Sequence, residues 1–210
     1  VVNGSGSVES RVENGHFGTE FESSDVASVE VTRDYELLLR PFTVTGSTVT
    51  IAPGGYTFSD VLASYALGAQ RRISGTMSVQ AGHYYDGIIK TVTFGSGRVS
   101  VLKQFSFEPT VSISRIDLPA GVFTTKLVRS RVDYGFSPLM FASALLQYSS
   151  ADRAFSSNLR FRWEYRPGSE LFVVYTDERD TTDERIAAPA LVRGLKNRAL
   201  VVKINRSLRF

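Results

Sequence analysis

The sequence predicts an all-β protein: an antiparallel up-and-down transmembrane β-barrel of the outer-membrane type, of which this chain is the C-terminal part. Three observations lead to this class. Apolar and polar residues alternate with a period of two over long segments. No stretch approaches the roughly 20 consecutive apolar residues of a membrane-spanning helix. The final strand-like segment runs to an aromatic terminus at Phe210. The mean hydropathy of −0.05 does not conflict with embedding, because only alternate residues of a barrel strand meet lipid.

Composition narrows the remaining classes. A chain of 210 residues suits a single β-barrel domain over 1–210, and the absence of cysteine excludes disulfides and thiolate metal sites. The net charge is +3, but the 24 basic residues are spread along the chain, so no nucleic-acid partner is expected. The N-terminal residues do not resemble a signal peptide. We therefore expect an export signal and further strands upstream of Val1.

Eleven strands are predicted in chain order, and each coincides with a segment in which apolar and polar residues alternate. Their ranges are 12–22, 26–40, 55–68, 71–84, 88–108, 110–118, 122–136, 138–149, 154–166, 169–178 and 198–210. Near the start, Val29 and Val31 alternate with Glu30 and Thr32. Proline is disfavoured inside a sheet, so Pro109 is read as the turn between the fifth and sixth strands. The only helix candidate, 185–195, contains a proline.

The ninth and last strands show the clearest pattern. In 155–166 the aromatic and aliphatic residues occupy one face and the charged residues the other. In the last strand the apolar series is Leu200, Val202, Ile204, Leu208 and Phe210. We expect this strand to be recognised by the barrel-assembly machinery. Arg206 interrupts its apolar face, as Lys103 interrupts that of 88–108. Either both side chains reach the membrane interface, or the register predicted for a strand is wrong.

Connection lengths and aromatic positions support this topology. If the last strand ends in the periplasm, the turns at 108–110, 136–138 and 166–168 are periplasmic and short, whereas the longer connections 40–55 and 178–197 lie outside. The strand ends next to these periplasmic turns, here called the lower ends, carry aromatic side chains at one level, as in the aromatic girdle of a membrane interface. These girdle residues are Phe105, Phe107, Tyr134, Phe136, Trp163 and Tyr165. An odd strand count differs from the even number of bacterial barrels and again indicates strands upstream.

The opposite face of the central strands is predicted to be a charged lumen wall. Its members are Arg129, Arg131, Asp133, Arg160, Arg162 and Glu164. A basic wall favours a small anionic solute. A glycan is the other possible partner. The alternative is purely structural, since opposite charges on neighbouring antiparallel strands pair with each other.

Catalytic and metal-binding signals are sparse. His16 and His83 have no fixed nucleophile partner, and no Gly-x-Ser-x-Gly motif is present, so no catalytic residue is assigned. Residues 177–185 alternate acids with arginines but lack the glycine and terminal glutamate of a calcium loop; we interpret them as a solvated outer loop. Gly95-Ser96-Gly97 is interpreted as a bulge or turn, because no helix follows. No cofactor is expected.

Several motifs resemble a family of large bacterial envelope proteins. They include Asp-Leu-Pro-Ala-Gly at 117–121, Phe-Ser-Pro at 136–138, and Arg-Phe-Arg-Trp-Glu-Tyr-Arg-Pro-Gly at 160–168. In that family a module similar to carbohydrate-binding family nine precedes a C-terminal barrel. The resemblance covers 98–210 most strongly. It implies an outer-membrane barrel fold and assigns no catalytic residues.

Three functions follow as alternatives. The first is an outer-membrane barrel of a Gram-negative bacterium that passes or docks a solute, with membrane lipid as its surroundings. The second is a structural anchor for a surface carbohydrate-binding protein. The third is a soluble lipocalin-like barrel with an apolar ligand. An outer-membrane hydrolase is the remaining alternative.

Overall fold

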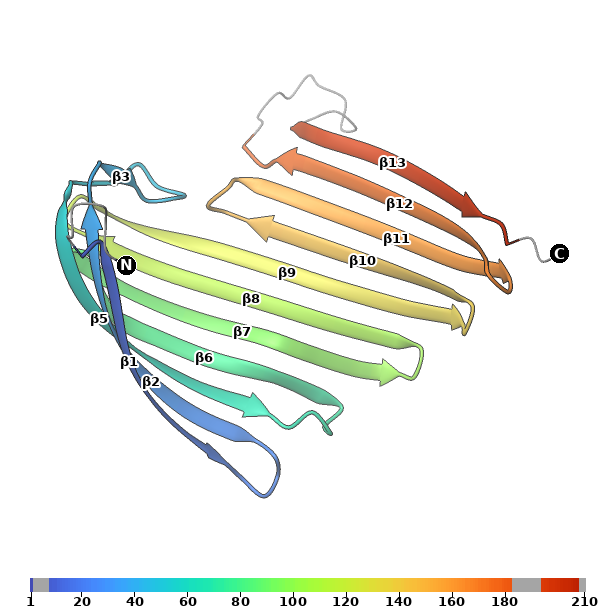
Figure 1. Cartoon of the computed structure of the whole chain (residues 1–210), viewed down its shortest axis with the longest axis horizontal. Coiled ribbons are helices and arrows are strands. Elements are labelled where there is room, and N and C mark those ends of the chain that lie inside the picture. Colours follow the sequence, from blue (N-terminus) through green and yellow to red (C-terminus); the bar gives the residue numbers. More distant parts are fainter. Residues whose placement is uncertain (2–7, 183–193, 208–210) are drawn as a thin grey trace. The chain divides into compact units, whose positions relative to one another are not determined.

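The computed structural model of the protein describes residues 1, 8–182 and 194–207. These residues form an eleven-stranded antiparallel sheet with hydrogen-bonded order β1-β2-β5-β6-β7-β8-β9-β10-β11-β12-β13 (Figure 1). The strands are β1 Ser10–Glu20, β2 Val26–Leu38, β5 Gly54–Leu67, β6 Ile73–Tyr84, β7 Gly87–Leu102, β8 Phe105–Leu118, β9 Gly121–Ser137, β10 Met140–Ser149, β11 Ala154–Arg166, β12 Ser169–Asp180 and β13 Leu195–Asn205. A short hairpin, β3 Phe42–Thr43 with β4 Thr50–Ile51, completes the set.

Contacts divide the chain into two compact units. The first unit comprises Val1–Gly95 and Val111–Lys126, and the second comprises Ser96–Thr110 and Leu127–Phe210. Strands that follow one another in the chain are neighbours in the sheet, apart from the β3–β4 hairpin in the connection from β2 to β5, so the connectivity is that of an up-and-down meander. The prediction of an all-β, antiparallel, up-and-down fold with eleven main strands is confirmed for the described residues.

The predicted boundary between the fifth and sixth strands was wrong. The turn between the fifth and sixth predicted strands is at Lys103 and Gln104, whereas Pro109 lies inside β8. A proline inside an antiparallel strand loses one ladder donor, a loss that the many remaining bonds of a 14-residue strand tolerate. The corrected boundary places Lys103 in a turn. Likewise β13 ends at Asn205, so Arg206 lies beyond the strand and does not interrupt its apolar face.

The first unit has a small buried core on its polar face. Val44, Val49 and Ile51 of the β3–β4 hairpin pack with Ile116 and Leu118 of β8, and all five are buried. Tyr56 and Tyr84 border this core, and Tyr56 is in register with Glu36 of the polar face of β2. The hairpin therefore covers the end of this face that lies near the 40–55 connection, which the sequence predicted only as a loop.

The opposite end of the first unit is closed by a buried carboxylate. Asp25, in the β1–β2 turn, is 3% exposed. It accepts hydrogen bonds from the backbone N–H of Gly68 at 2.7 Å, the hydroxyl of Tyr65 at 3.0 Å and Nη2 of Arg71 at 2.6 Å. The carboxylate thus ties the β1–β2 turn to the β5–β6 connection. The Gly68 hydrogen bond is the largest cause that lowers the Asp25 pKa to about 2, with Tyr65 and Arg71 adding to it against the effect of burial.

Stability is expected to fall in acid through Asp25. Because the folded-state pKa lies below the unfolded-state value of about 4, the ionised carboxylate stabilises the fold fully above pH 4, and this contribution disappears as the pH falls toward 2. Asp25→Asn should lower the urea midpoint at pH 7 and flatten its decline between pH 4 and pH 2. The control is Glu22→Gln, an exposed carboxylate in the same turn. Parallel pH curves for wild type and Asp25→Asn would contradict the assignment.

Candidate functional site

The register of the second unit separates its residues into two faces. On one face Val132, Ala144, Leu159, Tyr175 and Leu200 lie in one cross-strand row from β9 to β13. This apolar face also carries Phe161, Val173 and Val202 in the next row. A one-residue step along each strand moves to the opposite, polar face, because strand side chains alternate. The row there contains Arg131, Leu145, Asn158, Thr176 and Ala199.

The predicted charged wall lies along this polar face, and part of it is internally paired. Nε of Arg131 is 3.0 Å from Oδ2 of Asp133, and Nε of Arg160 donates to Oδ1 of Asn158 at 2.8 Å. Arg162 forms an ion pair with Glu170 of β12. Its guanidinium also lies 5.7 Å from the ring centroid of Phe172.

The wall is a stripe along the strands rather than one compact site. Arg129 is in register with Gln147, whereas Glu164 is near the turn at the other end of β11, where it accepts the Gly168 N–H at 3.0 Å. Sequence reasoning missed Glu170. This residue is in register with Glu164 and so lies diagonally across the ladder from Arg162, an arrangement that follows once the β11–β12 turn is placed at 166–169. The structure therefore brings Arg131 and Asp133 together, places Arg160 two strands away in the cross-strand row of Asp133, and leaves the ends of the wall apart.

Aromatic residues gather near the turns at the lower edge of the second unit. The rings of Tyr134 and Phe136 are 4.8 Å apart, and those of Trp163 and Tyr165 are 6.0 Å apart. Tyr165 donates its hydroxyl to the carbonyl oxygen of Asn205 at 3.1 Å. Phe105 and Phe107 open β8, the strand after the turn, instead of closing β7 as predicted. They remain at the same edge, and the girdle role of all six rings stays a prediction.

The terminal strand is exposed on its apolar face. Leu200, Val202 and Ile204 are 66%, 55% and 68% exposed. Among the described strands β13 pairs only with β12, so its outer edge has no ladder partner there. Leu208 and Phe210 of the predicted assembly strand lie outside the described residues.

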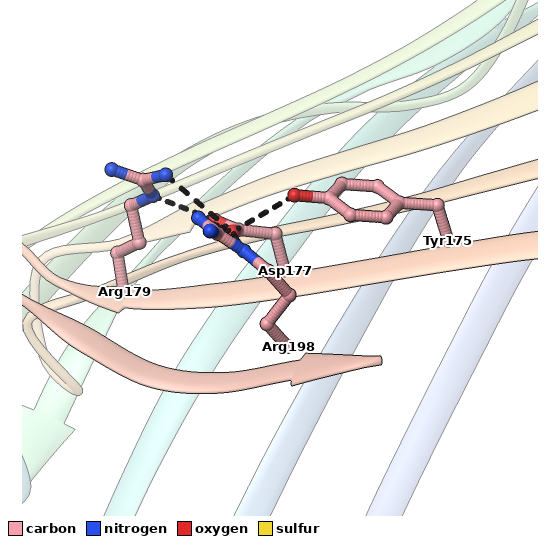
Figure 2. Close-up of polar contacts among 4 residues, drawn as sticks. All are labelled: Tyr175, Asp177, Arg179 and Arg198. Atoms are coloured by element: carbon pink, nitrogen blue, oxygen red, sulfur yellow. Dashed lines mark hydrogen bonds and ion pairs between the residues drawn. The ribbon is translucent and has the colours of Figure 1, made fainter. Parts of the chain in front are cut away.

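A charged cluster interrupts the apolar face near the β12–β13 connection (Figure 2). Asp177 of β12 is 5% exposed. It accepts from Nε of Arg179 at 2.6 Å, from Nη2 of Arg198 of β13 at 2.6 Å and from the hydroxyl of Tyr175 at 3.2 Å. Asp177 continues the series Leu171, Val173, Tyr175 at intervals of two residues, so its side chain lies on the same face as these three.

The interpretation of 177–185 as a solvated outer loop was therefore wrong for its first four residues. β12 continues to Asp180, and Asp177 pairs in register with Arg198. A run of alternating charges has the composition of a loop, which is why the sequence alone misled. The signal available was the unbroken period of two from Leu171 to Arg179.

A hollow opens on the polar face of the second unit, beside the β7–β8 and β9–β10 turns. Its volume is about 690 Å³. Arg98, Lys103 and Arg131 line it together with Asp133 and Phe141. The backbone N–H of Gly135 donates to the Gln104 carbonyl oxygen at 2.8 Å, which fixes the β7–β8 turn against β9. Sequence reasoning named Arg131 and Asp133 but not the hollow.

Comparison with known proteins adds no relative: no family model, no curated protein and no solved structure matches the chain. The resemblance to envelope proteins accordingly stays a prediction. Within the described ranges, no group of three or more His, Asp or Glu side chains is placed to hold a metal ion. The same ranges contain no helix with the length and apolarity needed to cross a membrane.

Proposed function

We propose that this chain forms part of the wall of an outer-membrane β-barrel and that its polar face lines a water-filled path for solutes. The observation that carries the proposal is the separation of faces in the second unit. Leu159 and Trp163 on the apolar face remain 43% and 44% exposed, and no second layer of described residues covers them. Exposed apolar areas of this extent are unusual on soluble monomers and mark contact with lipid or a partner.

The distribution of charges argues against a soluble lipocalin-like barrel. A soluble barrel that carries an apolar ligand directs its apolar face inward and its charges to water. Here the only buried apolar core of the described residues is on the polar face of the first unit, beneath the β3–β4 hairpin. The large apolar face of the second unit has no comparable cover, which suits a hydrocarbon solvent.

The polar face suits anions moderately. This face carries four arginines of the wall, at 129, 131, 160 and 162, and three carboxylates, those of Asp133, Glu164 and Glu170. A surplus of cations favours anionic solutes in a narrow aqueous path. The surroundings in this proposal are lipids of a Gram-negative outer membrane, and β13 is the strand read by the assembly machinery.

A second candidate is a structural anchor for a surface carbohydrate-binding protein. It is favoured by the internal pairing of the wall, Arg131 with Asp133 and Arg162 with Glu170, which lowers the charge available to a solute. The hairpin packed on the polar face of the first unit points the same way, because it occupies space that a path would need.

Conductance across a planar bilayer is the expected property that separates these candidates. The full chain, folded in detergent and reconstituted, should give discrete conductance steps. In a salt gradient its reversal potential should be shifted toward the equilibrium potential of the anion. Arg160→Gln should reduce that shift by about half, since an exposed wall charge acts through a screened field. A membrane-inserted chain without conductance would support the anchor. A chain that stays monodisperse without detergent would contradict both membrane candidates.

A further inference from the structure

We propose that the hollow beside the β7–β8 turn is a binding site for a small organic anion, a carboxylate or phosphate carried on a ring-sized body. The inference rests on the proposed function, because it names the class of solute that the polar face would take. The hollow lies wholly within the second unit, so its lining residues belong to one compact body.

Charge is the first argument. Three cations, Arg98, Lys103 and Arg131, line the hollow with a single carboxylate, that of Asp133, so the net charge is two positive. Asp133 is engaged by Nε of Arg131 at 3.0 Å. Among the described residues, the side chains of Arg98 and Lys103 form neither an ion pair nor a hydrogen bond, and both residues are exposed. Like charges gathered in one concave site repel each other, and an anion relieves this repulsion.

Shape is the second argument, and it depends on Gly135. The polar-face series of β9 runs Arg131, Asp133, Gly135, so the third position contributes no side chain. A Cβ at Gly135 would meet only the Gln104 carbonyl oxygen, at 3.9 Å, which leaves open space above the backbone. Phe141 is in register with Gly135 and borders this space without filling it.

Size and lining define the ligand class. A volume of about 690 Å³ lies within the range of small-molecule sites. The cations supply charge-assisted hydrogen bonds to a carboxylate or phosphate, and the guanidinium groups of Arg131 and Arg98 can bind two oxygens of either group at once. The exposed ring of Phe141 offers apolar contact to the body of the ligand. An inorganic anion would use the first of these features and a neutral sugar only the second.

Titration calorimetry of the full chain in detergent micelles tests the site with three probes. Glucuronate carries both features, glucose lacks the charge, and acetate lacks the ring-sized body. We expect glucuronate to bind at least tenfold more tightly than glucose or acetate, and its affinity to fall as salt is raised. Equal binding of glucuronate and glucose, or no binding of glucuronate, would overturn the proposal.

Variants assign the binding to the hollow. Lys103→Gln and Arg98→Gln should each weaken glucuronate about tenfold, because each removes a charged donor. Gly135→Leu should abolish binding by filling the hollow, whereas Gly135→Ala should retain most of it. Lys90→Gln, in β7 but outside the hollow, is the control and should bind as wild type. Unchanged affinity in Gly135→Leu, with its heat-modified gel shift retained, would refute the site.

The binding experiment and the conductance experiment can fail independently of each other. A chain that conducts ions but does not bind glucuronate refutes this site alone. A chain that is soluble without detergent yet binds glucuronate through Lys103 refutes the membrane path and keeps the site.

Discussion

Leu159→Arg is expected to abolish assembly into a membrane, whereas Asn158→Arg is expected to be tolerated. Leu159 occupies the middle of β11 and the middle of the apolar row that includes Val132, Tyr175 and Leu200. If hydrocarbon covers this face, an arginine there costs about 2–4 kcal/mol near the bilayer midplane. Such a loss is a large fraction of the stability of a folded domain.

Asn158 is the matched control, because it is the neighbouring residue of the same strand. It lies on the polar face, where it donates to the hydroxyl of Thr176 at 2.8 Å and shares that face with Arg160. An arginine at this position meets water. Heat modifiability on semi-native gels, with unheated samples from isolated membranes, measures the assembled fraction. Similar assembled fractions for the two variants would mean that the apolar face is not against lipid.

Alternation made the faces predictable, because one residue of slip in a strand exchanges every side chain between faces. This held from Leu159 to Tyr165, where aliphatic or aromatic residues alternate with charged residues without exception. Strand ends were less predictable. Pro109 was taken for a turn, but a long antiparallel strand accepts one missing donor, and the actual turn at Lys103 and Gln104 has no glycine or proline to mark it.

The tertiary features were beyond the sequence for a different reason. The β3–β4 hairpin has two-residue strands, too short to show a period, and its apolar residues become a core only through Ile116 and Leu118, far along the chain. The hollow depends on the absence of a side chain at Gly135, and a glycine in a sequence does not say what surrounds it. The wall residues were identifiable, whereas their pairing required the register.

Asp177→Asn is expected to destabilise the folded chain strongly. Asp177 is almost wholly buried on the apolar face, with Arg179 and Arg198 donating to its two oxygens at 2.6 Å. Asparagine keeps the shape and one acceptor but removes the negative charge that compensates two guanidinium groups. Removing one member of a buried ion cluster typically costs about 3–5 kcal/mol. Urea unfolding in detergent micelles should therefore show a clearly lower midpoint at pH 7.

Asp133→Asn is the comparison that makes this result specific. It also removes a carboxylate paired with an arginine, but on the polar face, where the side chain of Arg131 is 56% exposed. Exposed pairs contribute about 0–1 kcal/mol, so the midpoint should hardly move. A double variant strengthens the test. Asp177→Asn with Arg198→Gln should lose less stability than the sum of the two single losses, because the second change removes one of the two cations that Asp177 no longer neutralises. Additive losses, or equal shifts for Asp177→Asn and Asp133→Asn, would mean that the cluster is as hydrated as the wall and that the face carrying Leu159 meets water.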